Sequence, residues 1–212
     1  MSSLLERALG EDWSRLAPTL KAHYPSGPTH ERGEMTVEFP PAMRAPWWCL
    51  SRWGALVDWR GEGIRAEVRR FPQAGRERWQ RTLRYPDGAV RRFDSVWELT
   101  PRGHIVEFVN PYLGLELAPW LEGEGLRYRS VAYVLRLGRR QLALPRWLTP
   151  GQASIVERAV DAEHYAMDFR LVHPLFGQVF RYSGVFATGA AAYHGRLPDP
   201  DPCSRAPQAS DP

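Results

Sequence analysis

Trp79 and Arg81 are the two side chains whose types and spacing best suit the binding of an anionic group. They lie two positions apart in the alternating segment RERWQRTLRY, so in a strand both face the same side as Leu83 and Tyr85. A guanidinium on an inner sheet face needs a carboxylate, carbonyl oxygens or a bound anion. Two interpretations stay open. Arg81 pairs with an inward acid such as Glu107, or it holds the polar head of an amphipathic ligand.

His173 has the most suggestive setting among the histidines, because it precedes a proline between two apolar-aromatic runs. Pro174 pre-sets one turn dihedral and Gly177 can adopt a positive φ, which together favour a short hairpin turn. A catalytic base needs a partner such as a carboxylate. The nearest candidate, Asp168, lies five residues before His173, with no obvious geometry that would pair the two. The sequence therefore predicts a turn, with no catalytic role for His173.

Signatures of common enzymes and metal sites are absent from the sequence. It contains no G-x-S-x-G elbow, P-loop, G-x-G-x-x-G or H-E-x-x-H motif. Cys49 and Cys203 have neither metal-ligand spacing nor a disulfide framework around them. His23 and His30 near Glu31 could chelate an ion, but loop histidines rarely do. We therefore expect no cofactor, no metal and no catalytic residue.

The overall composition is that of a soluble globular protein with a strong bias towards arginine. Hydrophobic residues make up 43% of the 212, enough for a sizeable core. The net charge is +4, and Lys21 is the only lysine among 28 cationic residues. The arginines alternate with apolar residues, which suits strand faces and argues against a nucleic-acid partner. No apolar run approaches the ~20 residues of a transmembrane segment, and the charged start is unlike a signal peptide, so we expect a cytoplasmic chain.

The first forty residues predict one helix and one strand. Apolar residues recur at three- and four-residue steps over 2–23, where Pro18 could split the helix. Residues 24–33 are rich in turn formers and predict a loop. The segment EMTVEF at 34–39 predicts a short strand.

A second, Trp-rich helix is predicted over residues 46–59, PWWCLSRWGALVDW. It is apolar nearly all round, so it must be buried or touch something apolar. Three interpretations stay open. The helix packs on the sheet, covers an apolar cavity, or contacts a membrane surface with help from Arg44 and Arg52.

From Gly63 onward the hydrophobic period changes to two, which indicates strands. Short alternating runs are separated by turn signals such as PDG at 86–88, the pattern of an antiparallel meander. Residues 140–151, RQLALPRWLTPG, interrupt it as a loop or edge, because their prolines cannot donate ladder hydrogen bonds.

The predicted fold class is α+β, with both helices packed on a long, strongly curved antiparallel meander. About eight or nine strands would curl into a half-barrel or barrel, because a long sheet avoids free edges in this way. We expect a single domain over 1–189. Residues 190–212 are rich in Pro, Ala and Asp, and we expect them to be disordered.

Several motifs resemble those of a bacterial family known as domain of unknown function 4166 (DUF4166). Trp79-Gln80-Arg81 is similar to its W-x-R strand, and LALPRWLTP and DFRLVHPLFGQVFRYSGVF resemble its C-terminal signature. Members stand alone or follow a saccharopine-dehydrogenase-like reductase domain, and this chain, without a dinucleotide fingerprint, resembles the stand-alone form. Its RRQLALP differs from the family's Gly-Ile/Leu start. The resemblance implies no activity. It carries over Trp79, Arg81, Pro145, Leu148, Pro150, Pro174, Leu175, Gly177, Tyr182 and Gly184.

Three functional hypotheses follow. The first is a binding domain that encloses a lipid-like apolar or amphipathic ligand in the concave face of the sheet. The second is an interaction module that docks on a reductase partner through the Trp-rich helix or an exposed strand. The third and weakest is an enzyme centred on Arg81 and Glu107. The candidate ligand-binding residues are Trp79, Arg81, Phe93, Trp97, Phe180 and Tyr182.

Overall fold

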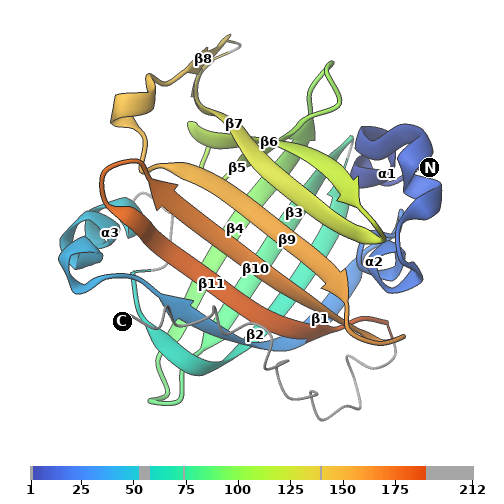
Figure 1. The fold of residues 1–212 in the computed structure, drawn as a ribbon, viewed down its shortest axis with the longest axis horizontal. Coiled ribbons are helices and arrows are strands. Elements are labelled where there is room, and N and C mark those ends of the chain that lie inside the picture. Colours follow the sequence, from blue (N-terminus) through green and yellow to red (C-terminus); the bar gives the residue numbers. More distant parts are fainter. Residues whose placement is uncertain (1, 53–57, 74, 139, 190–212) are drawn as a thin grey trace, which may run out of the picture.

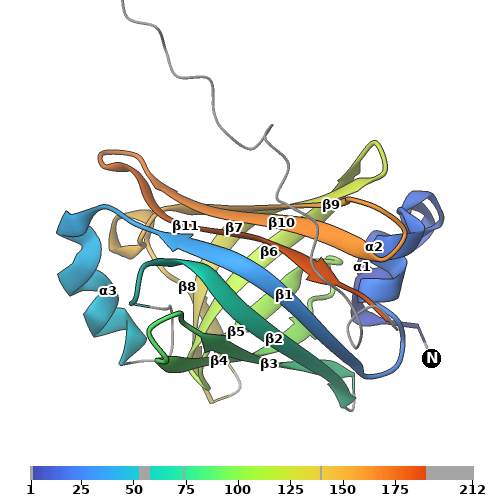
Figure 2. The ribbon, with the colours of Figure 1, turned by 90° about the horizontal axis from the view of Figure 1, so that it is seen from below.

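The fold is a closed antiparallel β-barrel with short helices at its two ends (Figures 1 and 2). The computed structural model describes residues 2–52, 58–73, 75–138 and 140–189. Neighbouring strands of the ring pair antiparallel, β7 pairs with β9, and β11 closes the ring on β1. The strands of the ring are β1 (Thr29–Glu38), β2 (Gly61–Gln73), β3 (Arg76–Arg84), β4 (Val90–Leu99), β5 (Ile105–Phe108), β6 (Leu113–Glu122), β7 (Gly125–Leu137), β9 (Gln152–Ala159), β10 (His164–His173) and β11 (Gly177–Ala187).

One strand of the sheet extends outside the ring. β8 (Arg140–Ala143) pairs with the last residues of β7 and is exposed along its length. A short 3₁₀ helix, η3 (Arg146–Leu148), follows it. The prediction of a loop or edge in this segment is confirmed, since an edge strand needs no hydrogen bonds on its outer side. β8 and η3 project from the barrel on the side where β7 leaves β9 (Figure 1).

The N-terminal segment forms three short helices in place of one long helix. They are α1 (Leu4–Leu9), η1 (Gly10–Arg15) and α2 (Pro18–His23). Ser3 caps α1 in a reciprocal capping box with Glu6, while Pro18 opens α2 as its first residue. The break at Pro18 was predicted. A second break follows from Gly10, whose positive φ of 58° ends α1.

The prediction of a loop over 24–33 is wrong for its second half, because β1 begins at Thr29. The inward positions of β1 are Glu31 and Gly33, followed by Met35 and Val37. A buried acid and a glycine hide the apolar alternation that marks a strand. β1 pairs with both β2 and β11, so it belongs to the ring, which therefore has ten strands, more than the eight or nine expected.

The Trp-rich helix is shorter than predicted. α3 spans Arg44–Ser51 after a 3₁₀ turn, η2 (Pro41–Met43), and Trp59 lies outside it. The remainder of the predicted helix, 53–57, lies outside the described residues, as does the tail over 190–212. Trp47 is buried against the barrel, its indole N–H donates to the Val179 carbonyl at 3.0 Å, and its ring meets Phe180 edge-on. α3 thus packs on the barrel through one of its tryptophans.

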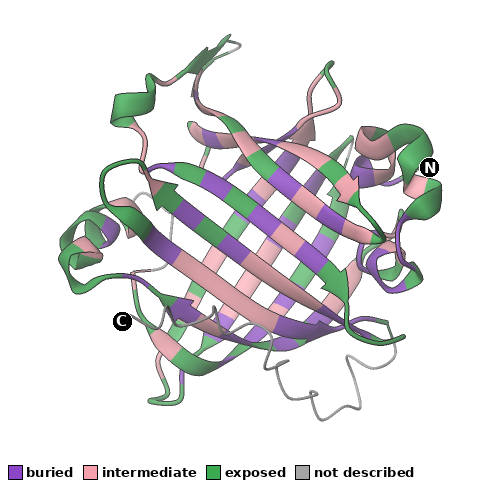
Figure 3. Ribbon diagram, viewed as in Figure 1, coloured by how far each residue is buried: buried purple, intermediate pink, exposed green. Residues whose placement is uncertain are grey.

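Alternation of buried and exposed residues runs along most strands of the ring (Figure 3). In β2, for example, Ile64, Ala66 and Val68 are buried while Arg65 and Arg69 are exposed. The inner faces form one apolar cluster to which α1, α2 and Trp47 contribute. Figures 1 and 2 show that α1 and α2 lie at one end of the barrel and α3 at the opposite end.

The segment around His173 is the hairpin turn that the sequence predicted. It joins β10 to β11, and Gly177 has a φ of 65°. The His173 Nδ1 accepts a hydrogen bond from the Leu175 N–H at 3.2 Å, and its ring stacks on Phe176 with centroids 4.8 Å apart. The contacts of His173 in the described structure are therefore those of a turn residue.

Candidate functional site

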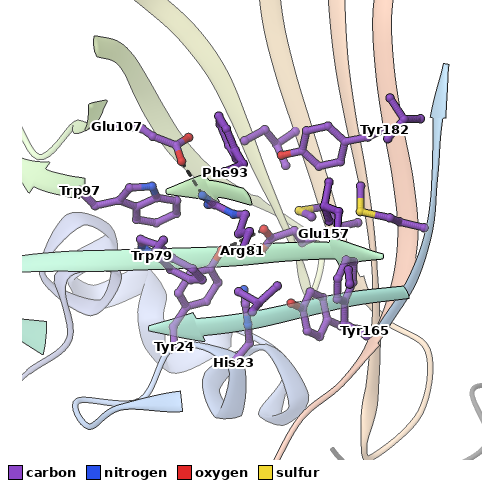
Figure 4. Close-up of a pocket in the computed structure, with 18 of the residues that line it drawn as sticks. His23, Tyr24, Trp79, Arg81, Phe93, Trp97, Glu107, Glu157, Tyr165 and Tyr182 are labelled. Atoms are coloured by element: carbon purple, nitrogen blue, oxygen red, sulfur yellow. Dashed lines mark hydrogen bonds and ion pairs between the residues drawn. The ribbon is translucent and has the colours of Figure 1, made fainter. Parts of the chain in front are cut away.

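A cavity of about 70 Å³ lies inside the barrel (Figure 4). Apolar side chains form most of its lining, and polar groups come from α2 and from several strands. The structure brings together all six residues proposed from the sequence. Those that line the cavity are Trp79, Arg81, Phe93, Trp97, Phe180 and Tyr182.

Arg81 points into the cavity and forms the predicted pair with Glu107 (Figure 4). Its guanidinium donates to Glu107 at 3.1 Å and to the Ser95 hydroxyl at 2.8 Å, and Ser95 donates to the same carboxylate at 2.6 Å. The guanidinium also lies over the rings of Trp79 and Phe93, 5.3 and 5.2 Å from their centroids. The pair is partly exposed, at 17% and 13% for its two side chains, so it retains contact with solvent.

A second polar group lies deeper in the barrel and joins α2 to β1 and β10. The His23 Nδ1 lies 2.7 Å from Glu31, and the Tyr165 hydroxyl donates to the same carboxylate at 2.9 Å. Burial, together with the negative charge of Glu31, raises the pKa of the Tyr165 phenol well above its ordinary value. The phenol therefore stays protonated and acts as a donor to Glu31.

Glu157 is a fully buried carboxyl at the cavity, 2.9 Å from the Tyr24 hydroxyl that donates to it. The Tyr128 hydroxyl donates in turn to that of Tyr24, also at 2.9 Å. Burial raises the pKa of the Glu157 carboxyl from 4.5 to about 7, although the nearby His23 and the Tyr24 hydrogen bond oppose the change. Near neutral pH this carboxyl can therefore hold or release a proton inside the barrel.

Trp79 and Trp97 carry buried donors without an acceptor. Their rings pack 4.9 Å apart, and only 2% and 4% of their surfaces are exposed. Within the described part of the chain, neither indole N–H has a hydrogen-bond partner. Buried donors nearly always find one, so two neighbouring exceptions at one cavity call for an explanation.

A buried ion pair lies at the end of the barrel that carries α1 and α2. Arg70, with no exposed surface, pairs with Glu77 at 3.0 Å and donates to the Gly27 carbonyl at 2.8 Å and to that of Pro25. Glu77 also accepts the N–H of Leu4 in α1 at 2.9 Å. The pair therefore ties α1 and the segment after α2 to β2 and β3.

Sequence reasoning missed four polar lining residues. The sequence suggests for His23 only the weak ion-binding role of a loop histidine. In the structure, His23 is the last residue of α2 and lies inside the barrel beside Tyr24. Glu157 and Tyr165 follow the alternation of β9 and β10, so the period of two alone places both on the inner face. The signal that could have identified Glu157 and Tyr165 is a polar side chain at an inward position of an apolar strand face.

Residues 16–186 match the profile of a family described as Domain of unknown function (DUF4166). The chain belongs to the DUF4166 family. No functionally curated protein matches it. Of the motif residues expected from the resemblance, Trp79, Arg81 and Tyr182 line the cavity, and Gly184 lies where β11 meets β1. The DUF4166 description names no activity, so its function has to be inferred from the site.

No group of three or more His, Cys, Asp or Glu side chains in the described ranges is arranged to hold a metal ion. The helices described for this DUF4166 chain are too short or too polar to cross a bilayer.

Proposed function

We propose that the barrel of this DUF4166 protein binds a small amphipathic ligand whose anionic or acceptor group lies against Trp79, Trp97 and Arg81. The observation that carries the proposal is the pair of buried indole N–H groups that find no acceptor among the described residues. A ligand oxygen between them would satisfy both donors, and the neighbouring guanidinium would favour a negative charge there. The partly exposed Phe93 and Tyr182, with Phe180, supply an apolar and aromatic surface for the rest of the ligand.

The size of the cavity restricts the ligand. A volume of about 70 Å³ is roughly half that of a cavity that holds benzene in a protein core, which is about 150 Å³. A long acyl chain does not fit this space, so a lipid would enter with one end only. The chemistry favours a short-chain carboxylate, or the polar end of a larger amphiphile.

The test is a titration followed on the indole N–H resonances of Trp79 and Trp97 in ¹⁵N-labelled protein, assigned with single Trp→Phe variants. The probes are straight-chain carboxylates from butyrate to decanoate. We expect both resonances to shift and the affinity to peak at an intermediate chain length. The double variant Arg81→Met/Glu107→Leu removes the ion pair without leaving an unpaired charge, and should weaken binding roughly tenfold or more.

The matched control is Arg69→Met/Glu67→Leu, which removes a pair at 2.7 Å outside the cavity together with the contact of Glu67 to His30. This control should leave the affinity unchanged. In parallel, native and denaturing mass spectrometry of protein purified from its own host would reveal a retained amphiphile. The proposal is wrong if no carboxylate shifts either indole and no retained mass is found. Docking on a reductase partner and enzymatic activity stay predictions.

A further inference from the structure

The most exposed apolar side chains of the protein gather at the α3 end of the barrel. Among the described residues, every large apolar side chain that is more than half exposed belongs to a segment at this end. Leu175 is 81% exposed, Trp147 79% and Phe176 69%. With Trp48 and Leu148, at 53% and 57%, they form what we call the loop-tip surface.

Three separate segments build the loop-tip surface. Trp48 comes from α3, Trp147 and Leu148 from η3, and Leu175 and Phe176 from the β10–β11 turn. Figures 1 and 2 both show these three segments close together at one end of the barrel. η3 and the β10–β11 turn project beyond the ring of strands (Figure 1), and their apolar side chains are exposed.

The charges carried by the three segments of the loop-tip surface have one sign. The segments 40–52, 140–151 and 172–178 contain no Asp or Glu, although the chain has 24 acidic residues. They carry four arginines, none of which forms an ion pair within the described residues. One of them, Arg52, lies over the ring of Trp48, 5.2 Å from its centroid. The four are Arg44, Arg52, Arg140 and Arg146.

We propose that the loop-tip surface binds the face of an anionic lipid bilayer. Protruding Trp, Phe and Leu side chains insert into the boundary between headgroups and acyl chains, where an indole is favourably placed. Unpaired arginines beside them attract acidic headgroups. A protein partner would have to supply acceptors for the guanidinium groups. Exposed apolar side chains on projecting segments that also carry arginines suit an anionic lipid surface better. This inference does not depend on occupation of the cavity.

The test is co-sedimentation of the full chain with vesicles of phosphatidylcholine alone, or with phosphatidylglycerol as about a third of the lipid. We expect binding to the acidic vesicles, reduced at least tenfold on neutral vesicles or in about 0.5 M NaCl. The variant Trp147→Ser/Phe176→Ser should lose at least tenfold in affinity. Arg140→Gln/Arg146→Gln should lose roughly tenfold as well, with the loss seen only at low salt.

Matched controls separate this surface from general effects of apolarity and charge. Trp120→Ser changes an exposed tryptophan on β6, and Arg65→Gln/Arg92→Gln removes two exposed arginines from the barrel wall. Both should bind acidic vesicles like the unmodified protein. Equal loss in the controls, equal binding to neutral vesicles, or no binding would overturn the proposal.

Two further readouts complete the design. If sedimentation velocity without lipid shows a dimer that Trp147→Ser/Phe176→Ser dissociates, the surface binds a second copy and the bilayer proposal is wrong. The cavity gives an independent readout. Trp147→Ser/Phe176→Ser should keep the carboxylate-induced indole shifts, and Arg81→Met/Glu107→Leu should keep vesicle binding. Failure of one proposal is thus distinguished from failure of the other.

Discussion

Two carboxyl groups inside the barrel illustrate how a residue's chemistry depends on its neighbours. Glu107 lies beside the guanidinium of Arg81, whereas Glu157 has a phenol as its hydrogen-bond donor. A guanidinium compensates a buried negative charge much more strongly than a hydroxyl does. The barrel therefore holds one carboxylate paired with a cation and one carboxyl whose proton is retained to about neutral pH.

The raised pKa of Glu157 predicts how stability depends on pH. Below about 4.5 the carboxyl is protonated in both the folded and the unfolded state. Between about 4.5 and 7 the folded state keeps a proton that the unfolded state has lost, so the free energy of unfolding falls as pH rises. Above about 7 both states are ionised and this decrease ends. The total decrease is about 3 kcal/mol.

Glu157→Gln should remove that decrease, since the amide can still accept the Tyr24 hydrogen bond but does not titrate. Urea denaturation of both proteins from about pH 5 to 8 would measure it. As pH rises, we expect the free energy of unfolding of the variant to increase relative to that of the unmodified protein, by up to about 3 kcal/mol. Parallel curves for the two proteins would contradict the assignment.

At the scale of elements, the buried Arg70–Glu77 pair helps to hold the barrel end that carries α1 and α2. Arg70 and Glu77 lie on neighbouring strands, and between them they bind the backbone of α1 and of the segment after α2. Helices of six residues have little stability of their own, so their position depends on such contacts.

Arg70→Met should destabilise the protein by about 3–5 kcal/mol, because it leaves the Glu77 carboxylate buried without a cation. Thermal and urea unfolding would measure the loss. The control is Arg76→Met. Arg76 pairs with Glu98 at the same distance, 3.0 Å, but its side chain is 60% exposed, so the expected loss is below about 1 kcal/mol. Similar losses in the two variants would show that burial of the pair is unimportant.

At the scale of the whole molecule, the barrel is closed by the contact between its first and last strands. Gly184 of β11 lies opposite Met35 of β1, and Gly33 of β1 lies opposite Phe186. A Cβ on Gly184 would lie 2.5 Å from the Glu34 carbonyl oxygen and 2.8 Å from the Met35 Cβ. The strands approach this closely only because a side chain is missing at that position.

Gly184→Ala should therefore force β1 and β11 apart and cost at least about 1–3 kcal/mol. Hydrogen exchange should show faster exchange for amides of both strands, while β3 and β4 change less. Gly27→Ala is the control, because nothing lies within 4 Å of its added Cβ. Its stability should stay within about 0.5 kcal/mol of the unmodified protein. Unchanged exchange in Gly184→Ala would mean that the seam adapts without opening.

The amino-acid sequence by itself determined most of the strands, their turns and which side chains share a face of a strand. A period of two is a local property, so it placed Trp79, Arg81, Phe93 and Trp97 on one side without knowledge of the fold. Turn residues such as Pro174 and Gly177 set the backbone conformation locally, so they also predicted a hairpin. Even the pairing of Arg81 with Glu107 was among the expected alternatives, since both belong to inner faces.

Only the tertiary structure decided that the sheet closes and what meets inside it. Glu157 bonds to Tyr24, and Tyr165 to Glu31, across 133 and 134 positions of the chain. Such contacts depend on strand tilt, stagger and twist summed around the whole ring, and no local pattern encodes that sum. The same holds for the loop-tip surface, because its three segments become neighbours only when the barrel brings their strand ends to one side.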